Sequence, residues 1–214
     1  DAKTFAEWEV DYVKLDWCGD IKKDLKAGKQ AHLDFAKAMN ESKREMFLEV
    51  VAGYFFLWGD VPSVANSWRF CTDHHDEWKS SSVQLTCRIN QKKSVSGKPG
   101  AWPYMDFLLT GGEGCSKNGV IHPHCPGQTD DEYRTTFALW SISQSPMIVA
   151  TDVRNFTGVM SETILNKDII KLHQSTETPP GGHIKYWECS ELLSCEVWGR
   201  KINANGTSWM VALV

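Results

Sequence analysis

The sequence predicts an α/β protein with a parallel sheet, followed by a short all-β segment. From residue 10 to about residue 178, short apolar runs alternate with segments of helical periodicity, which is typical of repeated βα units. After Pro179-Pro180-Gly181-Gly182 no helical period remains, and short strands joined by turns are expected. With 214 residues, of which 42% are hydrophobic, the chain is long enough to bury a substantial core.

The first half of the chain predicts alternating strands and helices. The expected helix is amphipathic, because Leu33, Ala36 and Met39 share one face. The apolar runs around it are short enough to be buried strands. In chain order, the expected strand, helix, strand, strand and helix cover residues 10–16, 30–44, 46–51, 66–70 and 76–89.

The best-defined element of the second half is a helix over residues 130–143. Residues 129–132 have the form of a capping box, and Tyr133, Phe137 and Trp140 follow at helical spacing. The other expected elements are strands at 104–109 and 145–151, a last helix at 161–167, and three β strands at 184–188, 195–199 and 208–214.

Charge and hydropathy exclude two classes of partner. The chain has 23 Lys and Arg against 27 Asp and Glu and no dense basic block, so nucleic acid is not an expected partner. The longest apolar run, Val50 to Trp58, has nine residues, whereas a spanning helix needs about 20, so no membrane span is expected. Residues 1–8 lack the features of a secretion signal, which leaves a removed signal or, as we favour, an N-terminus further upstream.

The cysteines indicate disulfides rather than a metal site. No pair of CxxC elements has zinc-site spacing, and the odd total of seven leaves one cysteine over. Cys115 with Cys125 and Cys189 with Cys195 would close short loops, so these pairs are expected, while a Cys71–Cys87 pair is left open by the spacing. Three acceptor sequons, at Asn40, Asn155 and Asn205, make a secretory history the expectation.

The histidines do not indicate a metal or a nucleophilic triad. They show neither HExxH spacing nor a recognisable partner for a nucleophilic Ser. No glycine-rich phosphate loop precedes a helix. No metal or cofactor is therefore expected.

Two carboxylates stand where predicted strands end. Lys14 and Asp16 lie two residues apart and therefore on one face of the first strand, where burying a charged pair without function is costly. Asp73 follows Arg69 just past the strand at 66–70. The structural alternatives are an ion pair for the first two residues and a helix cap for Asp73.

If both carboxylates project into one cleft, the chemistry that fits is glycoside hydrolysis, with one nucleophile and one proton donor. Retention of configuration requires the carboxyl groups of Asp16 and Asp73 to lie about 5 to 6 Å apart.

The segments around these carboxylates resemble glycoside hydrolase family 27, the α-galactosidases and α-N-acetylgalactosaminidases. Residues 2–18 are similar to the family's strand-four signature, which implies that Asp16 is the nucleophile. Residues 66–73 are similar to its strand-six element, which implies that Arg69 contacts sugar and Asp73 is the acid/base. Residues 129–155 and the strand Glu196-Val197-Trp198 extend the resemblance over nearly the whole chain.

The resemblance also implies a substrate-binding set. Glu49 matches the Glu of the family's Cys-Glu-Trp element near the sugar 2-position, although its neighbours here are Leu48 and Val50. In the stretch from Gly100 to Leu108 only Trp102 and Asp106 match the family pattern, so the pocket floor is expected to differ. The implied substrate-binding residues are Lys14, Trp17, Glu49, Arg69, Trp102 and Asp106.

In fold, the resemblance implies the C-terminal part, about strands 4–8, of a TIM (β/α)8 barrel over residues 1–178, followed at 179–214 by the start of an antiparallel β-sandwich. A whole barrel takes about 250 residues, so the chain is expected to be part of a longer protein. The N-terminal half of the barrel, from the same protein or another chain, is then the expected partner. It would cover the edge beside the first strand and supply the Cys that pairs with Cys18. A homodimer or larger assembly is left open.

In function, the resemblance implies a retaining α-galactosidase that is secreted or lies in a lysosome or vacuole, with an α-galactoside as substrate. One alternative is an α-N-acetylgalactosaminidase. In this family such enzymes have small residues where Glu49 stands, so Glu49 favours galactose, while Ala52 and Gly53 leave the question open. The other alternative is a non-catalytic, barrel-derived structural or carbohydrate-binding component of an extracellular assembly.

Overall fold

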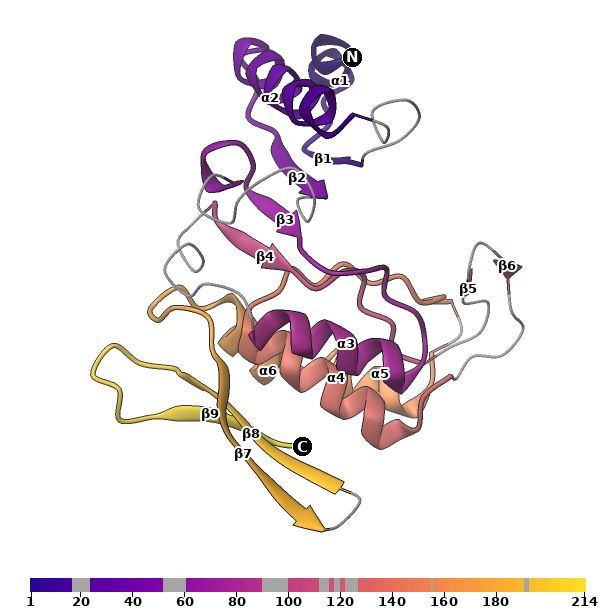
Figure 1. Ribbon diagram of the computed structural model, residues 1–214, viewed down its shortest axis with the longest axis vertical. Helices are drawn as coiled ribbons and strands as arrows, with labels where there is room; N and C mark the ends of the chain where they lie inside the picture. Colours follow the sequence, from indigo (N-terminus) through magenta and orange to yellow (C-terminus); the bar gives the residue numbers. More distant parts are fainter. Residues whose placement is uncertain are drawn as a thin grey trace. The chain divides into compact units, whose positions relative to one another are not determined.

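The computed structural model describes residues 1–16, 24–51, 61–89, 100–111, 116–117, 120–121, 127–154, 156–190 and 193–214 (Figure 1). The chain forms two compact units. Unit 1 comprises Asp1–Phe70 and Ser94–Tyr104, and unit 2 comprises Cys71–Lys93 and Met105–Val214.

Unit 1 is built on a four-stranded parallel sheet with the strand order β1-β2-β3-β4 (Figure 1). Leu48, Val50 and Trp68 are buried and alternate with polar residues along their strands, which is the pattern of a sheet with one apolar face. The strands are β1 (Tyr12–Leu15), β2 (Phe47–Val51), β3 (Ser67–Arg69) and β4 (Trp102–Tyr104), and a short 3₁₀ turn lies at Val61–Ser63.

Two helices belong to unit 1, α1 (Ala2–Glu7) and α2 (Leu25–Glu41). The helix α2 begins five residues earlier than the sequence pattern predicts, because the Asp24 carboxylate accepts the backbone N–H groups of Lys26 and Ala27 and so caps its first turn. The apolar periodicity starts only after this polar turn. A pattern of apolar residues alone therefore misses the true start of the helix.

Four helices lie in unit 2: α3 (Trp78–Ile89), α4 (Asp130–Ser143), α5 (Gly158–Thr163) and α6 (Lys167–Gln174). The helix α4 has the bounds that the sequence predicts, with the capping box between Thr129 and Glu132 in place. The single helix expected at 161–167 is wrong. Thr157 caps α5, and Asn166 accepts the N–H of Ile169 and starts α6 anew, so two short helices replace one.

The strands expected at 104–109 and 145–151 are largely wrong. The strand β4 ends at Tyr104, and beyond it Asp106 has a left-handed φ of 72°, which breaks an extended run. The later segment contains Pro146, which has no N–H to donate to a ladder. One parallel bridge between Leu108 and Val149 remains. The pair β5 (Ser116–Lys117) and β6 (Val120–Ile121) is antiparallel.

The end of the chain forms an antiparallel sheet of β7 (Gly182–Ser190), β8 (Leu193–Lys201) and β9 (Trp209–Leu213), coloured from orange to yellow in Figure 1. The strands β8 and β9 contact α4 within unit 2. Gly181 leads into the sheet, because a side chain there would place its Cβ 2.4 Å from the carbonyl oxygen of Gly199. The Pro/Gly stretch at 179–182 thus marks the change from helices to strands, and an independent domain from residue 179 stays a prediction.

A buried guanidinium ties this sheet to the helices. The Arg200 side chain on β8 donates to the carbonyl oxygens of Leu172, Ser175, Thr178 and Pro179, and only 1% of it is exposed. Burial lowers the pKa of Arg200 to about 10, so it remains charged at neutral pH. Four carbonyl acceptors compensate its loss of water.

Candidate active site

One face of the sheet in unit 1 carries most of the predicted polar residues. Lys14, Glu49 and Ser67 are register partners across β1, β2 and β3, and Trp102 on β4 continues their row. Side chains two residues apart in a strand point to the same side, so the next row holds Arg69 and its partner Tyr104. Asp16 follows β1 at the same row, because Leu15 pairs with Val50 and Arg69 pairs with Val51.

A buried glutamate lies at the centre of this face. Glu49 is fully buried; it accepts the hydroxyl of Tyr12 on one oxygen, and its other oxygen lies 3.5 Å from the Lys14 Nζ. The same ammonium lies over the Tyr104 ring, 5.4 Å from the centroid. Burial, the hydrogen bond to Glu49 and its charge together raise the pKa of Tyr12 well above its usual value. Tyr12 therefore stays a neutral donor that holds the carboxylate.

The other members of the face differ in exposure. Arg69 is buried, Trp102 is half-buried and Asp16 is exposed. Asp16 stands one residue past the carboxyl end of β1, where the loops of a parallel sheet carry catalytic groups. The structure thus brings Lys14 and Glu49 into contact and places Asp16 and Arg69 on the same face.

The remaining two predicted carboxylates belong to unit 2. Asp73 is exposed and lies between Cys71, which forms a disulfide with Cys87, and His74. The helix α3 starts only at Trp78, so the alternative that Asp73 caps it is wrong. Since Asp16 and Asp73 lie in different units, their expected separation stays a prediction.

Asp106 is held by backbone groups. It is 5% exposed, and its two carboxylate oxygens accept the N–H groups of His74 and Phe107, each at 2.9 Å. These bonds explain why a non-glycine residue adopts a left-handed φ at this position. The expected role of Asp106 in sugar binding stays a prediction.

The other expected residues are the remaining Trp, the cysteines and the sequon asparagines. Trp17, Cys18, Cys115, Cys125 and Asn155 lie outside the described residues. Cys189 and Cys195 form the expected disulfide, and the Cys71–Cys87 disulfide answers the pairing that the spacing left open. Asn40 and Asn205 are exposed, as glycan acceptors must be.

Sequence reasoning missed Tyr12 and Tyr104. The alternation Tyr12-Val13-Lys14-Leu15-Asp16 was a signal for Tyr12, since all three polar residues share a strand face. Nothing in the sequence signalled Tyr104, because its contact with Lys14 depends on where β4 enters the sheet.

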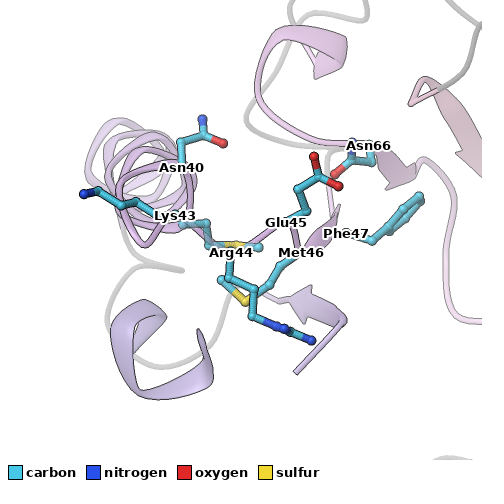
Figure 2. Close-up of a pocket in the computed structure, with 8 residues that line it drawn as sticks. Asn40, Lys43, Arg44, Glu45, Met46, Phe47 and Asn66 are labelled. Carbon is cyan, nitrogen blue, oxygen red and sulfur yellow. The ribbon is translucent and has the colours of Figure 1, made fainter. Parts of the chain in front are cut away.

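A hollow of about 550 Å³ in unit 1 lies at the other end of the sheet. Figure 2 shows its lining, with Asn40 and Lys43 at the end of α2, Glu45 and Phe47 at the start of β2, and Asn66 before β3. These are the amino ends of parallel strands, whereas Asp16 stands at a carboxyl end. The hollow therefore lies at the opposite end of the sheet from Asp16.

Across the part of the chain that the structure describes, no group of three or more His, Cys, Asp or Glu side chains is arranged to hold a metal ion. Among the helices of that same part, none has the length and apolar character needed to cross a bilayer.

Comparison with known proteins gives consistent matches. Residues 1–175 match the family described as alpha galactosidase A. An alpha-galactosidase of Cyamopsis tetragonoloba is 30% identical over 96% of this chain and 44% of its own length. The chain thus spans about half the length of the curated relatives it matches.

Solved structures show the same fold. A family 27 β-L-arabinopyranosidase from Geobacillus stearothermophilus has a TM-score of 0.80 at 23% identity, covering 99% of this chain and 47% of that one. The alpha-galactosidase of Saccharomyces cerevisiae with raffinose has a TM-score of 0.79 at 20% identity, covering 100% of this chain and 50% of that one. The predicted fold class, part of a (β/α)8 barrel followed by antiparallel strands, is confirmed. Since its family match covers residues 1–175, the chain belongs to the alpha galactosidase A family, the melibiase-like glycosidases of family 27.

Proposed function

We propose that the protein containing this chain is a retaining glycoside hydrolase that releases terminal α-linked galactose. The observation that carries the proposal is the polar face of unit 1, where Lys14, Glu49 and Arg69 line the sheet beside Asp16 at the carboxyl end of β1. Parallel-barrel enzymes hold their catalytic groups at this end. Family membership supports the same chemistry.

In the proposed mechanism the Asp16 carboxylate attacks the anomeric carbon. The bond to the leaving oxygen breaks as the Asp73 carboxyl donates its proton to that oxygen, and a galactosyl ester of Asp16 forms. Asp73, now a carboxylate, takes a proton from water, and the resulting hydroxide equivalent displaces Asp16 from the sugar. Two inversions give net retention, and both carboxyl groups return to their starting states.

The remaining face residues would bind the sugar. The Lys14 ammonium and the Arg69 guanidinium are donors, and the Glu49 carboxylate is an acceptor, which together suit the hydroxyl groups of a pyranose ring. Burial of Glu49 beside Lys14 fixes both groups before substrate arrives, which reduces the ordering cost of binding. Trp17, Trp102 and Asp106 are proposed to complete the sugar contacts.

Glu49 supports galactose rather than N-acetylgalactosamine as the substrate. Its side chain is held in place by Tyr12 and Lys14 and therefore cannot swing away to admit an N-acetyl group without losing both contacts. The non-catalytic alternative has less support, because Asp16 is exposed one residue past the carboxyl end of β1, where barrel enzymes carry their catalytic groups.

The proposed site also needs the first strands of the barrel, and the proposal includes a cellular location. We propose that the rest of the barrel, and with it the sugar contacts of the first strands, is supplied by the same protein, since the chain spans about half of its relatives. The two disulfides and the exposed sequons at Asn40 and Asn205 support a secreted, lysosomal or vacuolar location.

The test is turnover of 4-nitrophenyl glycosides by the whole protein that contains this chain. We expect kcat/KM for the α-galactoside to exceed that for the α-N-acetylgalactosaminide and the β-L-arabinopyranoside by more than about 100-fold, because a site that hydrogen-bonds a substrate hydroxyl strongly rejects analogues that lack it. A preference for the N-acetyl sugar would overturn the substrate assignment. Binding of galactose without turnover of any glycoside would favour the non-catalytic alternative.

A further inference from the structure

The backbone on both sides of Asp73 is tied to other elements of unit 2. On its N-terminal side, Cys71 forms a disulfide with Cys87 of α3. On its C-terminal side, the N–H of His74 donates to the Asp106 carboxylate at 2.9 Å. The backbone of Asp73, which lies between these two anchors, therefore has little freedom to move.

The His74 ring is itself locked. Only 7% of His74 is exposed, and its Nδ1 lies 2.7 Å from the carbonyl oxygen of Phe107. A carbonyl can only accept, so Nδ1 carries the proton and donates. On the other side of the ring, Nε2 lies 2.9 Å from the Ser81 hydroxyl of α3. The ring also packs against Trp140 of α4, with centroids 5.1 Å apart.

The protonation state of His74 agrees with this arrangement. Burial lowers the pKa of His74 below its usual value, which keeps the ring neutral at pH 7. With Nδ1 donating, Nε2 of the neutral ring is an acceptor, and the single hydroxyl proton of Ser81 is shared between Nε2 and the Gln128 side-chain oxygen. Asp106, Asp76 and His75 are the titratable groups that act on the ring.

The chain of hydrogen bonds continues away from the ring. The Gln128 side-chain oxygen lies 3.1 Å from the Ser81 hydroxyl and also accepts from Thr136, while its amide donates to Asp76. Tyr133 of α4 donates to both oxygens of Asp76 at 2.8 Å. His74 is therefore fixed by two helices and by the segment around Asp106.

We infer that His74 is a positioning residue for Asp73. Its ring, held between Phe107 and Ser81, and its backbone N–H, held by Asp106, set the place from which the preceding carboxyl delivers its proton. The inference rests on the proposed function, in which Asp73 is the general acid and base. A carboxyl displaced by about 1 Å loses about 100-fold in rate where its proton transfer limits the reaction.

This role has a signature that loss of folding does not share. Glycosidic bonds to weakly acidic phenols need protonation of the leaving oxygen, whereas bonds to strongly acidic phenols break with little help from an acid. A misplaced acid therefore lowers kcat/KM for the first kind of substrate and hardly affects the second. A smaller fraction of folded protein lowers both equally.

The experiment compares kcat/KM of the whole protein on 4-methoxyphenyl and 2,4-dinitrophenyl α-galactosides. His74→Phe keeps an aromatic ring against Trp140 and removes both ring hydrogen bonds. We expect it to lose about 100-fold on the methoxyphenyl substrate and less than about threefold on the dinitrophenyl substrate. His74→Asn, whose amide can donate to the Phe107 oxygen, should recover part of the loss, and His75→Ala is the matched control with unchanged values.

Two further variants separate the possible failures. Asp73→Ala should show the same selective loss to a greater degree, and an equal loss on both substrates would overturn the acid/base assignment and with it the proposed function. If Asp73→Ala is selective but His74→Phe loses equally on both substrates or not at all, the positioning role alone is overturned. Should His74→Phe not fold, Ser81→Ala removes only the partner of Nε2 and should show a smaller loss of the same selective kind.

Discussion

Asp16→Asn is expected to abolish turnover of α-galactosides by the whole protein while leaving its unfolding transition unchanged. The amide that replaces the carboxylate cannot form the galactosyl ester, and losses of about 10⁴-fold or more are usual when a nucleophile is removed. Asp16 is exposed, so its substitution disturbs no packed core. The measurement pairs kcat for a 4-nitrophenyl α-galactoside with the thermal unfolding midpoint.

The matched control for this experiment lies at the other end of the same strand. Asp11 is exposed and pairs with Arg44 just before β1, so Asp11→Asn changes a charge of the same kind away from the carboxyl end. It should retain the activity of the unmodified protein. An Asp16→Asn protein as active as the Asp11→Asn protein would contradict the nucleophile assignment.

Glu49→Ala is expected to cause the largest loss of stability in unit 1. The substitution removes the acceptor of the Tyr12 hydroxyl and the counter-charge of Lys14, and it leaves a small cavity at a fully buried position. Removing one partner of a buried ion pair costs about 3 to 5 kcal/mol. We expect a loss of about 3 kcal/mol here, because a quarter of the Lys14 side chain is exposed to solvent. Urea unfolding of the whole protein measures this free energy.

Two related variants define what Glu49 contributes. Glu45→Ala removes an exposed glutamate just before β2 and should stay within about 0.5 kcal/mol of the unmodified protein. Glu49→Gln keeps the shape of the side chain and an oxygen that can accept the Tyr12 hydroxyl. It removes the negative charge that faces the Lys14 ammonium. We expect it to lower kcat/KM for the α-galactoside about tenfold with a smaller loss of stability. Unchanged stability of Glu49→Ala would show that the Lys14 contact is not held in solution.

The elements that could be predicted are those specified by nearby residues. The bounds of α4 follow from the capping box at Thr129 and from Tyr133, Phe137 and Trp140 at helical spacing, all within 12 residues of one another. The strand β2 runs from Phe47 to Val51, within the expected 46–51, because four of its five residues are apolar. In these cases the local pattern and the final environment agree, and the prediction is correct.

The elements that could not be predicted depend on distant contacts. The extended run expected at 104–109 is interrupted at Asp106, whose left-handed backbone is stabilised by the N–H of His74, 32 residues earlier in the chain. No pattern around Asp106 shows that contact. The same holds for His74, whose position between Phe107 and Ser81 appears only once the chain has folded.

Of the candidate site, the strand alternation placed Lys14 and Asp16 on one strand face from the residues alone, whereas the expected burial of the pair is wrong for Asp16, which is exposed. The contact between Lys14 and Glu49 required knowing that β1 and β2 are paired with these two residues in register. Tyr104 was missed for a similar reason. Its ring lies under the Lys14 ammonium only because β4 joins the same sheet as β1, in the order β1-β2-β3-β4.

The central claim is that galactose is released by two displacements at its anomeric carbon. The first is by the Asp16 carboxylate and the second is by water. This claim is tested most directly by following the released sugar with ¹H NMR during the first minutes of hydrolysis of an α-galactoside by the whole protein, before mutarotation mixes the anomers. Two inversions predict that α-galactose appears first and converts slowly to the β form. If β-galactose is the first product, a single displacement by water has occurred, and the role of Asp16 as a covalent nucleophile is contradicted.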